Sequence, residues 1–242
     1  MRYLKLTLCY DGTAYHGWQI QPNVKTVQGE VERAIKEIFK EDITVIGSSR
    51  TDAGVHAKEY VINFATNANI PTEKVPIALN TKLKSDVRIL MCEEVDENFH
   101  ARKSAKNKTY RYTINQSYNL FERFYEWFLP LPLDKEKMVK ASKHFIGTHD
   151  FKGFMSVGSS FDTTVKTINS VDINFEKDKI IIDINGDGFL YNMVRIIVGT
   201  LVFVGMGNLT EDEIPSVIKS GERQRAGMTA PANGLALLKV NY

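Results

Sequence analysis

Cysteine is scarce in this 242-residue chain, which contains only two, Cys9 and Cys92. Two cysteines so far apart cannot form the disulfide framework of a small secreted domain, and they are typical of buried thiols in a reducing compartment. Long hydrophobic runs are also missing, because the longest, residues 196–204, is far shorter than the roughly 20 residues that span a bilayer. The N-terminus lacks the apolar segment of a signal peptide. We therefore expect a soluble, cytoplasmic protein without membrane association.

An excess of charge of either sign is absent as well. Lysine and arginine number 31, aspartate and glutamate number 29, and the net charge is +2. A chain this balanced is not a histone-like polycation, so binding to nucleic acid would require positive charge gathered on one face. No Cys-x-x-Cys or His-Glu-x-x-His motif occurs, and a zinc site would therefore need scattered ligands.

The spacing of apolar residues predicts a mixture of strands and helices. Strands are predicted at 4–10, 43–47, 60–65, 87–95, 164–175, 179–186 and 235–242, and helices at 26–40, 76–84, 135–145, 191–205 and 210–219. Segments 164–175 and 179–186 are predicted to form a hairpin, and 153–163 a mobile surface loop. This order favours an α+β fold rich in antiparallel pairs over a doubly wound parallel sheet. A boundary near residues 98–106 would divide the chain into two halves of similar plan, which we place at residues 1–104 and 105–242.

A polar segment follows the predicted strand at 43–47, where residues 47–57 read GSSRTDAGVHA. Arg50 and Asp52 are two residues apart, so an extended backbone would point both side chains the same way. Gly54 lets the backbone approach a ligand closely. An arginine and a carboxylate aimed at one place suit a nucleophile with a charge partner, but they also suit a capped turn held by a surface ion pair. The residue types alone leave both interpretations open.

Residues 98–121 contain no acidic residue and interleave basic with aromatic side chains. Arginine and lysine neutralise phosphates while tyrosine and phenylalanine stack on bases, a combination typical of proteins that bind single-stranded RNA or a flipped base. The alternative is a solvated strand whose aromatic side chains pack inward. If the segment binds RNA, its candidate phosphate ligands are Arg102, Lys103, Lys106, Lys108 and Arg111.

Two further segments carry residue types suited to a functional site. Residues 188–195, GFLYNMVR, place Arg195 beside a strongly apolar predicted helix. Burying this arginine is costly unless a carboxylate meets it, and the alternative is a helix-end arginine that reaches water. Residues 144–151 contain His144 and His149, either of which could titrate near neutrality. For His149 we expect a structural hydrogen bond.

At these residues the sequence resembles the tRNA pseudouridine synthase A family, over essentially the whole chain. The matching blocks are residues 10–13, 17–19, 26–29, 50–57, 99–102, 110–112, 147–151, 189–195, 226–231 and 234–235. The resemblance implies a pseudouridine synthase fold, in which two α/β subdomains share a mainly antiparallel sheet with an active-site cleft between them. It also implies a homodimer that needs no metal and no organic cofactor.

The reaction implied by the resemblance is the isomerisation of uridine to pseudouridine at positions 38, 39 and 40 of the tRNA anticodon stem-loop. By the same carry-over, Asp52 is the catalytic nucleophile and Arg195 pairs with it. Tyr110 and Leu190 contact the substrate, and Arg50 helps to hold the nucleotide flipped. A carboxylate can assist by attacking C1′ of the ribose, by attacking C6 of the uracil or by removing a sugar proton. The sequence does not choose among these three routes.

Other functions compete with this enzyme. One is a diverged paralogue with a narrower set of RNA targets, and another is a non-catalytic tRNA-binding protein on the same scaffold. A third is an RNA glycosidase or nuclease that uses Asp52 with His56 or His149. The intact Arg-Thr-Asp segment argues against a non-catalytic protein, and the lack of a second well-placed carboxylate weakens the third function.

Overall fold

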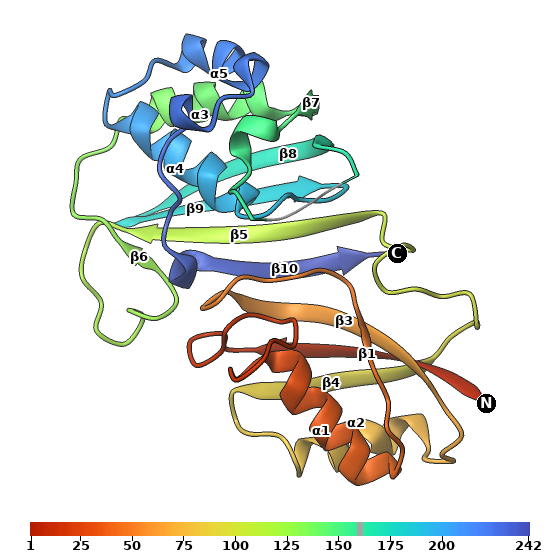
Figure 1. The fold of residues 1–242 in the computed structure, drawn as a ribbon. Helices are drawn as coiled ribbons and strands as arrows, with labels where there is room; N and C mark the ends of the chain where they lie inside the picture. Colours follow the sequence, from red (N-terminus) through yellow and green to blue (C-terminus); the bar gives the residue numbers. More distant parts are fainter. Residues whose placement is uncertain (159–161) are drawn as a thin grey trace. The chain divides into compact units, whose positions relative to one another are not determined.

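A computed structural model describes residues 1–158 and 162–242 of the chain (Figure 1). The chain forms two compact units, the first of Met1–Lys106 with Ala236–Tyr242 and the second of Asn107–Leu235. The sequence predicted a division between residues 104 and 105 and placed the closing strand in the second subdomain. In the structure this strand, β10 (Leu235–Asn241), belongs to the first unit from Ala236 onwards, and Ala236 pairs with His56 of that unit.

The first unit is built on a mainly antiparallel sheet with two helices. Its strands, in order across the sheet, are β4 (Val87–Glu94), β1 (Arg2–Tyr10), β3 (His56–Thr66) and β10, with the short β2 (Ile46–Gly47) also paired to β3. All these pairs are antiparallel except β3 with β10. The helices are α1 (Val27–Phe39) and α2 (Val75–Asn80), the latter after the 3-10 turn η1 (Thr72–Lys74).

Alternating side chains of β1 and β3 form the core beneath α1. Leu4, Leu6 and Leu8 are fully buried, and they lie opposite Phe64, Ile62 and Tyr60 of β3, respectively. Helix α1 begins as predicted, because the Thr26 hydroxyl accepts a hydrogen bond from the Gly29 amide. The ring of Phe39 meets that of Phe64 edge to face, with 5.5 Å between centroids, which fixes the helix on this face of the sheet.

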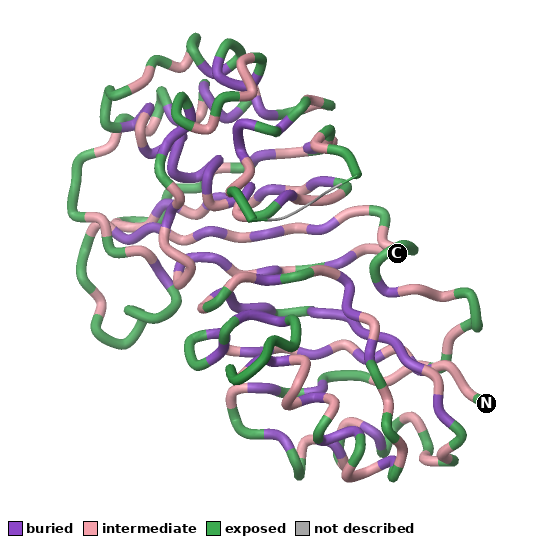
Figure 2. The backbone as a smooth tube through the Cα atoms, in the orientation of Figure 1, coloured by how far each residue is buried: buried purple, intermediate pink, exposed green. Residues whose placement is uncertain are grey.

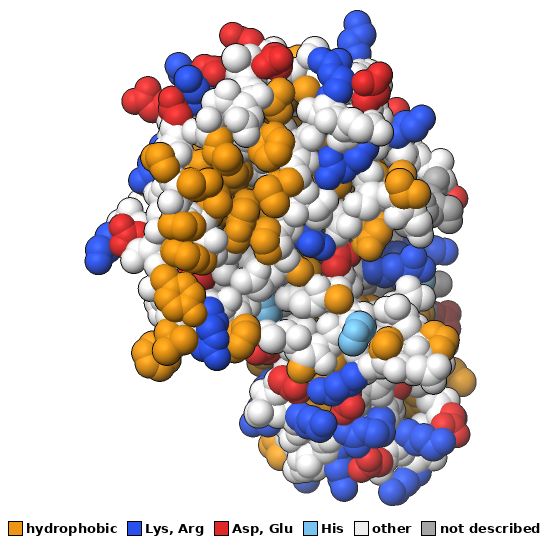
Figure 3. All heavy atoms as spheres, turned by 60° about the vertical axis from the view of Figure 1, so that its left-hand side comes forward, with side chains coloured by type: hydrophobic (Ala, Val, Ile, Leu, Met, Phe, Trp, Pro, Cys, Tyr) orange, Lys and Arg blue, Asp and Glu red, His pale blue; other side chains and the backbone are white. Residues whose placement is uncertain are grey.

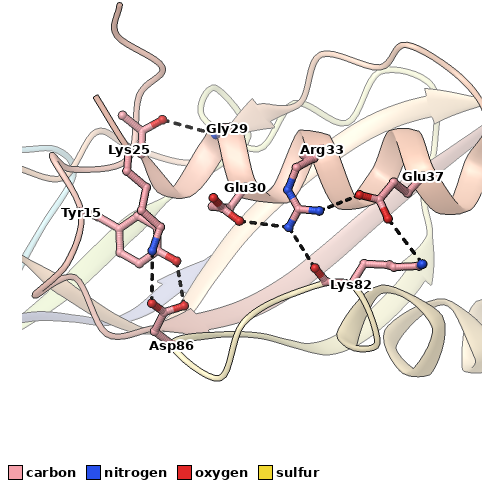
Figure 4. A network of polar contacts seen from close by, with 9 residues as sticks. Tyr15, Lys25, Gly29, Glu30, Arg33, Glu37, Lys82 and Asp86 are labelled. Atoms are coloured by element: carbon pink, nitrogen blue, oxygen red, sulfur yellow. Dashed lines mark hydrogen bonds and ion pairs between the residues drawn. The ribbon is translucent and has the colours of Figure 1, made fainter. Parts of the chain in front are cut away.

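The loop between β1 and α1 is fastened to the start of β4 (Figure 4). The Tyr15 hydroxyl donates a 2.7 Å hydrogen bond to Asp86, and Lys25 Nζ lies 3.4 Å from the same carboxylate. Lys25 Nζ also lies over the Tyr15 ring, 3.9 Å from its centroid. Burial and the neighbouring Asp86 raise the pKa of Tyr15, so the phenol remains a donor.

The second unit also contains mainly antiparallel strands, and its described residues form three helices. Its strands, in order across the sheet, are β5 (Asn107–Asn115), β9 (Lys179–Gly186), β8 (Val165–Glu176) and β7 (Gly147–Asp150), with the short β6 (Trp127–Phe128) parallel to β5. The helices are α3 (Lys135–Ser142), α4 (Met193–Gly205) and α5 (Ile214–Ser220). In the described part of this unit there are also five 3-10 turns: η2 (Lys143–Phe145), η3 (Lys152–Phe154), η4 (Glu211–Glu213), η5 (Arg223–Arg225) and η6 (Ala232–Gly234).

Helix α4 forms the centre of the second unit. Nearly all of its side chains are buried, because it packs against α3, β5 and η3 (Figures 1 and 2). Beside it, Ile180, Ile182 and Ile184 of β9 are fully buried. They pair with Ile114, Tyr112 and Tyr110 of β5, respectively, and so place these residues on one face of the sheet.

The predicted α+β fold class with mainly antiparallel pairing is confirmed, as is the hairpin of β8 and β9. The strand predicted at 43–47 is shorter than expected, because the Val45 amide donates to Glu32 of α1 instead of pairing with a strand. Nine residues of the basic and aromatic stretch, 107–115, form strand β5, and the buried Tyr110 and Tyr112 agree with the alternative of a strand whose aromatic side chains pack inward. The predicted loop at 153–163 includes residues 159–161, which lie outside the described residues, and it begins inside η3 with Phe154 fully buried.

Candidate functional site

Asp52 lies in the loop between β2 and β3, and the backbone of this loop is held by hydrogen bonds from the β1–α1 connection. The Trp18 amide donates to the Thr51 carbonyl at 3.2 Å, and the Gly54 amide donates to the Tyr15 carbonyl at 3.2 Å. Two loops therefore support each other on either side of Asp52. A side chain on a loop whose backbone is fastened in this way keeps its position better than a side chain on a loop without such contacts.

Two glycines allow this close approach of one loop to the other. Gly17 has φ +82°, and a Cβ there would overlap the Thr51 carbonyl and lie 3.1 Å from the carbonyl carbon of Asp52. A Cβ on Gly12 would overlap the Val55 carbonyl. Glycine is required at both positions because the opposing backbone fills the space of a side chain. Both glycines belong to the blocks that carry the family resemblance.

Three aromatic side chains lie beneath the Asp52 loop. The rings of Trp18 and Tyr60 stack with centroids 4.1 Å apart, and Tyr10 lies 5.7 Å from Tyr60. The Tyr10 hydroxyl and the Thr51 hydroxyl are 2.9 Å apart, a buried hydrogen bond one residue before Asp52. The loop thus rests on the core of the first unit. Asp52 itself is half-buried, whereas Arg50 is exposed.

The histidines have structural contacts. Nδ1 of the buried His56 accepts a 3.0 Å hydrogen bond from the Gly12 amide and lies 3.2 Å from the Asp11 carboxylate. In the second unit, Nε2 of His149 is 3.1 Å from the Ile146 carbonyl. The structural hydrogen bond predicted for His149 is therefore confirmed. His56 holds the turn after β1 against the loop that carries Asp52.

Arg195 lies in the first turn of α4, half-buried and oriented by two acceptors. Its Nε donates to the Ala230 carbonyl at 2.7 Å, and one terminal nitrogen donates to Asn192 Oδ1 at 2.7 Å. Asn192 has the left-handed φ of 60° just before the helix. Its side-chain amide nitrogen, Nδ2, donates to the Ser156 hydroxyl at 2.9 Å. These contacts offset part of the cost of removing a guanidinium from water and fix its direction.

The acceptor Ala230 is positioned by close packing of residues 226–230 on α4. A Cβ on Gly199 would overlap the Met228 carbonyl, and one on Gly227 would lie 2.5 Å from the Thr200 amide. The Gly227 amide donates to the Thr200 hydroxyl at 2.9 Å. Backbone thus lies directly on backbone, which brings this segment within reach of the Arg195 side chain.

The two predicted substrate contacts of the second unit are both buried. Tyr110 of β5 is 6% exposed, and its ring meets Phe189 edge to face with 5.2 Å between centroids. Leu190 follows directly and is 4% exposed. Phe189 lies in a matching block, but sequence reasoning gave it no role. Through its contact with Tyr110, Phe189 supports the tyrosine ring.

The five predicted RNA ligands divide into two groups. Arg102, Lys103 and Lys106 of the first unit are exposed. In the second unit Lys108 is buried, and Arg111 forms two hydrogen bonds of 2.8 and 2.7 Å with Asp183 of β9. The hydrogen bonds to Asp183 raise the pKa of Arg111 and neutralise its charge locally. Only the first group presents charge that is fully available to a phosphate.

Two kinds of feature are missing from the described residues. Among them, no group of three or more histidine, cysteine, aspartate or glutamate side chains is arranged to hold a metal ion. Within the same part of the chain, no helix combines the length and the apolar character needed to cross a membrane.

Comparison with known proteins places these residues in a family. The family model described as tRNA pseudouridine synthase matches residues 8–102 and 141–242. Relatives named tRNA pseudouridine synthase A are 48% identical in Thermoanaerobacter sp. (strain X514) and 51% identical in Acetivibrio thermocellus, each over 244 aligned residues and 100% of both chains. A relative in Clostridium perfringens, named tRNA pseudouridine synthase A 2, is 50% identical over the same coverage. The chain belongs to the tRNA pseudouridine synthase family.

Membership in this family confirms the resemblance that the sequence motifs indicated. Among solved structures, a chain in an archaeal box H/ACA sRNP complex matches with a TM-score of 0.41 and 10% identity, covering 97% of this chain and 47% of that one. Sequence reasoning assigned no role to four residues of this site: Trp18, Tyr60, Asn192 and Phe189. Trp18, Asn192 and Phe189 lie inside matching blocks, which is the signal that could have found them.

Proposed function

We propose that this protein converts uridine to pseudouridine at positions 38, 39 and 40 of the tRNA anticodon stem-loop, with Asp52 as the nucleophile. The observation that carries the activity is the match over the full chain, at about 50% identity, to relatives named tRNA pseudouridine synthase A. The enzyme is accordingly an isomerase. The three target positions, the role of Asp52 and a cytoplasmic location are the finer parts of the proposal.

The chemistry needs a single well-held carboxylate. The isomerisation breaks the bond from C1′ to N1, turns the uracil and joins C1′ to C5, with no net redox change. Asp52 must be ionised to attack C1′ or C6 or to remove a sugar proton. Its loop is fastened through Thr51 and Gly54, so its position does not have to be fixed anew when substrate binds. This rigidity supports the assignment.

The other site residues have supporting roles in the proposal. Arg195, oriented by Asn192 and Ala230, would favour the ionised form of the catalytic carboxylate. Tyr110, backed by Phe189, together with Leu190 would hold the uracil after it leaves the stack, because a ring face offsets part of the unstacking cost. Arg50, exposed at the Asp52 loop, would help to keep the nucleotide flipped.

The phosphate backbone would be bound first of all by Arg102, Lys103 and Lys106. These side chains are exposed, whereas Lys108 is buried and Arg111 is paired with Asp183. Lys108 and Arg111 remain in the proposed RNA-binding set, but we expect each to contribute less. Sequence-independent contacts of this kind set the register of the tRNA rather than its identity.

The proposal includes a homodimer, which an apolar surface of the second unit supports. Hydrophobic side chains gather on one face of the second unit (Figure 3). Residues 117–131 expose seven large apolar side chains, among them Phe121 at 85% exposure. They are Tyr118, Leu120, Phe121, Phe124, Tyr125, Phe128 and Leu131. The Asn233 amide donates to the carbonyls of Arg123 and Glu126, and so fastens this surface. Apolar patches of this kind are typical of interfaces.

The dimer is tested by size-exclusion chromatography with light scattering. We expect the unmodified protein to have twice the monomer mass and Phe121→Asp to have the mass of a monomer, because the charge would be buried without a partner. Met206→Asp changes an exposed apolar residue of the second unit outside this surface and serves as the control. A monomeric unmodified protein at micromolar concentration would contradict the homodimer.

The function is tested by the fate of uridine in tRNA. Purified protein is incubated with unmodified tRNA in chelator and without nucleotide, and the digested nucleosides are then identified and mapped. We expect pseudouridine at positions 38, 39 and 40 in intact RNA. Pseudouridine at only some of these positions would favour the paralogue with fewer targets, and unchanged uridine would favour a non-catalytic binding protein. Free uracil or cut strands would favour a glycosidase or nuclease.

A further inference from the structure

Tyr60 of β3 is completely buried, and its hydroxyl forms hydrogen bonds with the loop that carries Asp52. The ring stacks on Trp18, and the phenol lies against the backbone of Ser49. The hydroxyl donates to the Ser49 carbonyl and accepts from the Ser49 amide, with 3.4 Å between nitrogen and oxygen. One side chain thus holds both polar groups of one residue in the loop that carries Asp52.

The approach of Tyr60 to this loop depends on Gly47 at the end of β2. A Cβ on Gly47 would overlap the Tyr60 hydroxyl and lie 2.6 Å from Trp18 Nε1. The missing side chain therefore makes the space in which the phenol and the indole reach the loop. The backbone of Tyr60 is itself held by strand pairing, because Tyr60 lies opposite Leu8 of β1.

A second tyrosine acts on the same loop two residues further along. The Tyr10 hydroxyl bonds to the Thr51 hydroxyl at 2.9 Å, and Tyr10 lies beside Tyr60 at 5.7 Å between ring centroids. Ser49 and Thr51 are therefore attached to two adjacent strands through phenol groups. Asp52 is the next residue, and its backbone direction follows from these two attachments.

We propose that Tyr60 is a positioning residue for Asp52, acting through its hydroxyl on the Ser49 backbone. This inference rests on the proposed function, because it assigns Tyr60 to the reaction in which Asp52 is the nucleophile. A phenol that merely fills the core would contribute through its ring alone. A positioning phenol contributes through the hydroxyl, and its loss lowers the rate of the chemical step rather than the binding of tRNA.

The variant Tyr60→Phe separates the two roles because it keeps the ring and its stack on Trp18. We expect kcat for pseudouridine formation to fall about tenfold or more, while KM for tRNA stays within about twofold. Tyr242→Phe is the matched control, since the Tyr242 hydroxyl donates to the Ala101 carbonyl at 2.8 Å in the same unit. The control should retain the kcat of the unmodified protein.

Single-turnover rates with saturating enzyme, normalised to the fraction that binds tRNA, remove any effect of partly unfolded protein. A Tyr60→Phe rate equal to that of the unmodified protein overturns the proposal, as does a loss matched by Tyr242→Phe. A rise in KM with kcat unchanged overturns it too. If the unmodified protein itself makes no pseudouridine, the proposed function fails before the variant is measured.

Discussion

At the scale of single residues, the substitution Asp52→Asn tests the proposed nucleophile most directly. It keeps the size of the side chain but removes its charge and its nucleophilic oxygen. We expect turnover to fall by several orders of magnitude, on the order of 10³ or more, because no other carboxylate lies in residues 50–57. Binding of tRNA should be equal or slightly stronger, since one negative charge has been removed. Pseudouridine formation and tRNA affinity are measured on the same preparation.

The exposed Glu59 of β3 provides the control for this loss of charge. Glu59→Gln removes a carboxylate from the same unit without touching the Asp52 loop, so its turnover should remain normal. Substantial turnover in Asp52→Asn would refute the assignment of Asp52 as the nucleophile. Loss of tRNA binding and of activity together would favour the alternative in which Asp52 only holds a turn by an ion pair.

Tyr110 is expected to bind the base through its ring. Tyr110→Phe keeps the edge-to-face contact with Phe189, at 5.2 Å between centroids, and should retain most of the affinity for tRNA. Tyr110→Ala removes the stacking surface and should weaken binding by about 1–3 kcal/mol, the usual value for one base on one aromatic ring. The dissociation constants of both variants are compared with turnover, which is expected to fall further than binding in Tyr110→Phe. Equal losses of affinity would exclude the stacking role.

At the scale of elements, the packing of α4 against residues 226–230 connects stability with the orientation of Arg195. Gly199→Ala places a methyl group where the Met228 carbonyl lies, so the two segments must separate. We expect a loss of about 1–3 kcal/mol in the free energy of unfolding, as for other overpacked sites. The rate of pseudouridine formation should fall too, because Ala230 moves away from Arg195 Nε.

Urea unfolding and single-turnover rates measure the two effects of Gly199→Ala. Gly188→Ala is the matched substitution for stability, since the nearest atom to its Cβ, on Lys166, is 3.9 Å away. The stability of that variant should stay close to normal. A Gly199→Ala protein with normal stability and rate would show that the segment does not depend on this contact.

At the scale of the whole molecule, the affinity for tRNA should fall steeply with salt concentration. Each lysine or arginine that neutralises a phosphate releases counterions and adds to the slope of log K against log salt. Lys103→Ala should therefore lower the slope by about one, whereas Arg111→Ala should change it less because Asp183 already pairs with Arg111. Affinities at several salt concentrations provide the slopes. Equal effects of the two variants would contradict the division of the basic residues into two groups.

The stability of the protein should decrease at alkaline pH. Burial raises the pKa of the Cys92 thiol to about 11 from an ordinary value of 9.0, and burial also raises the pKa of Tyr112 and Tyr242. For Cys92 the folded value lies above the unfolded one, so its contribution is complete below pH 9 and is lost as the pH rises towards 11. The melting temperature should fall across this window, and it should fall less in Cys92→Ala than in the unmodified protein. A melting temperature independent of pH from 9 to 11 would contradict this.

Much of the fold was readable from sequence because it depends on local periodicity and end signals. The alternation of Leu4, Leu6 and Leu8 fixes which face of β1 is buried, and Thr26 caps α1 as its position before the helical repeat predicts. The polar block at residues 47–52 made Asp52 a candidate, because a polar segment with glycine after a strand is a local feature, and the family resemblance gave it the role of nucleophile, which stays a prediction. Matching blocks along the chain then indicated the family, which comparison with relatives confirmed.

Contacts between residues distant in sequence were decided by the tertiary structure alone. Strand register places Asp183 against Arg111, and this pair limits an RNA-binding role that composition suggested. The same kind of distant pairing brings β10 to β3. The contact of Tyr60 with Ser49 likewise follows from how β3 and the Asp52 loop pack together. A sequence pattern records which residues prefer burial or extension, but strand pairing and close packing determine which side chains meet and therefore which charges and hydroxyls remain available for function.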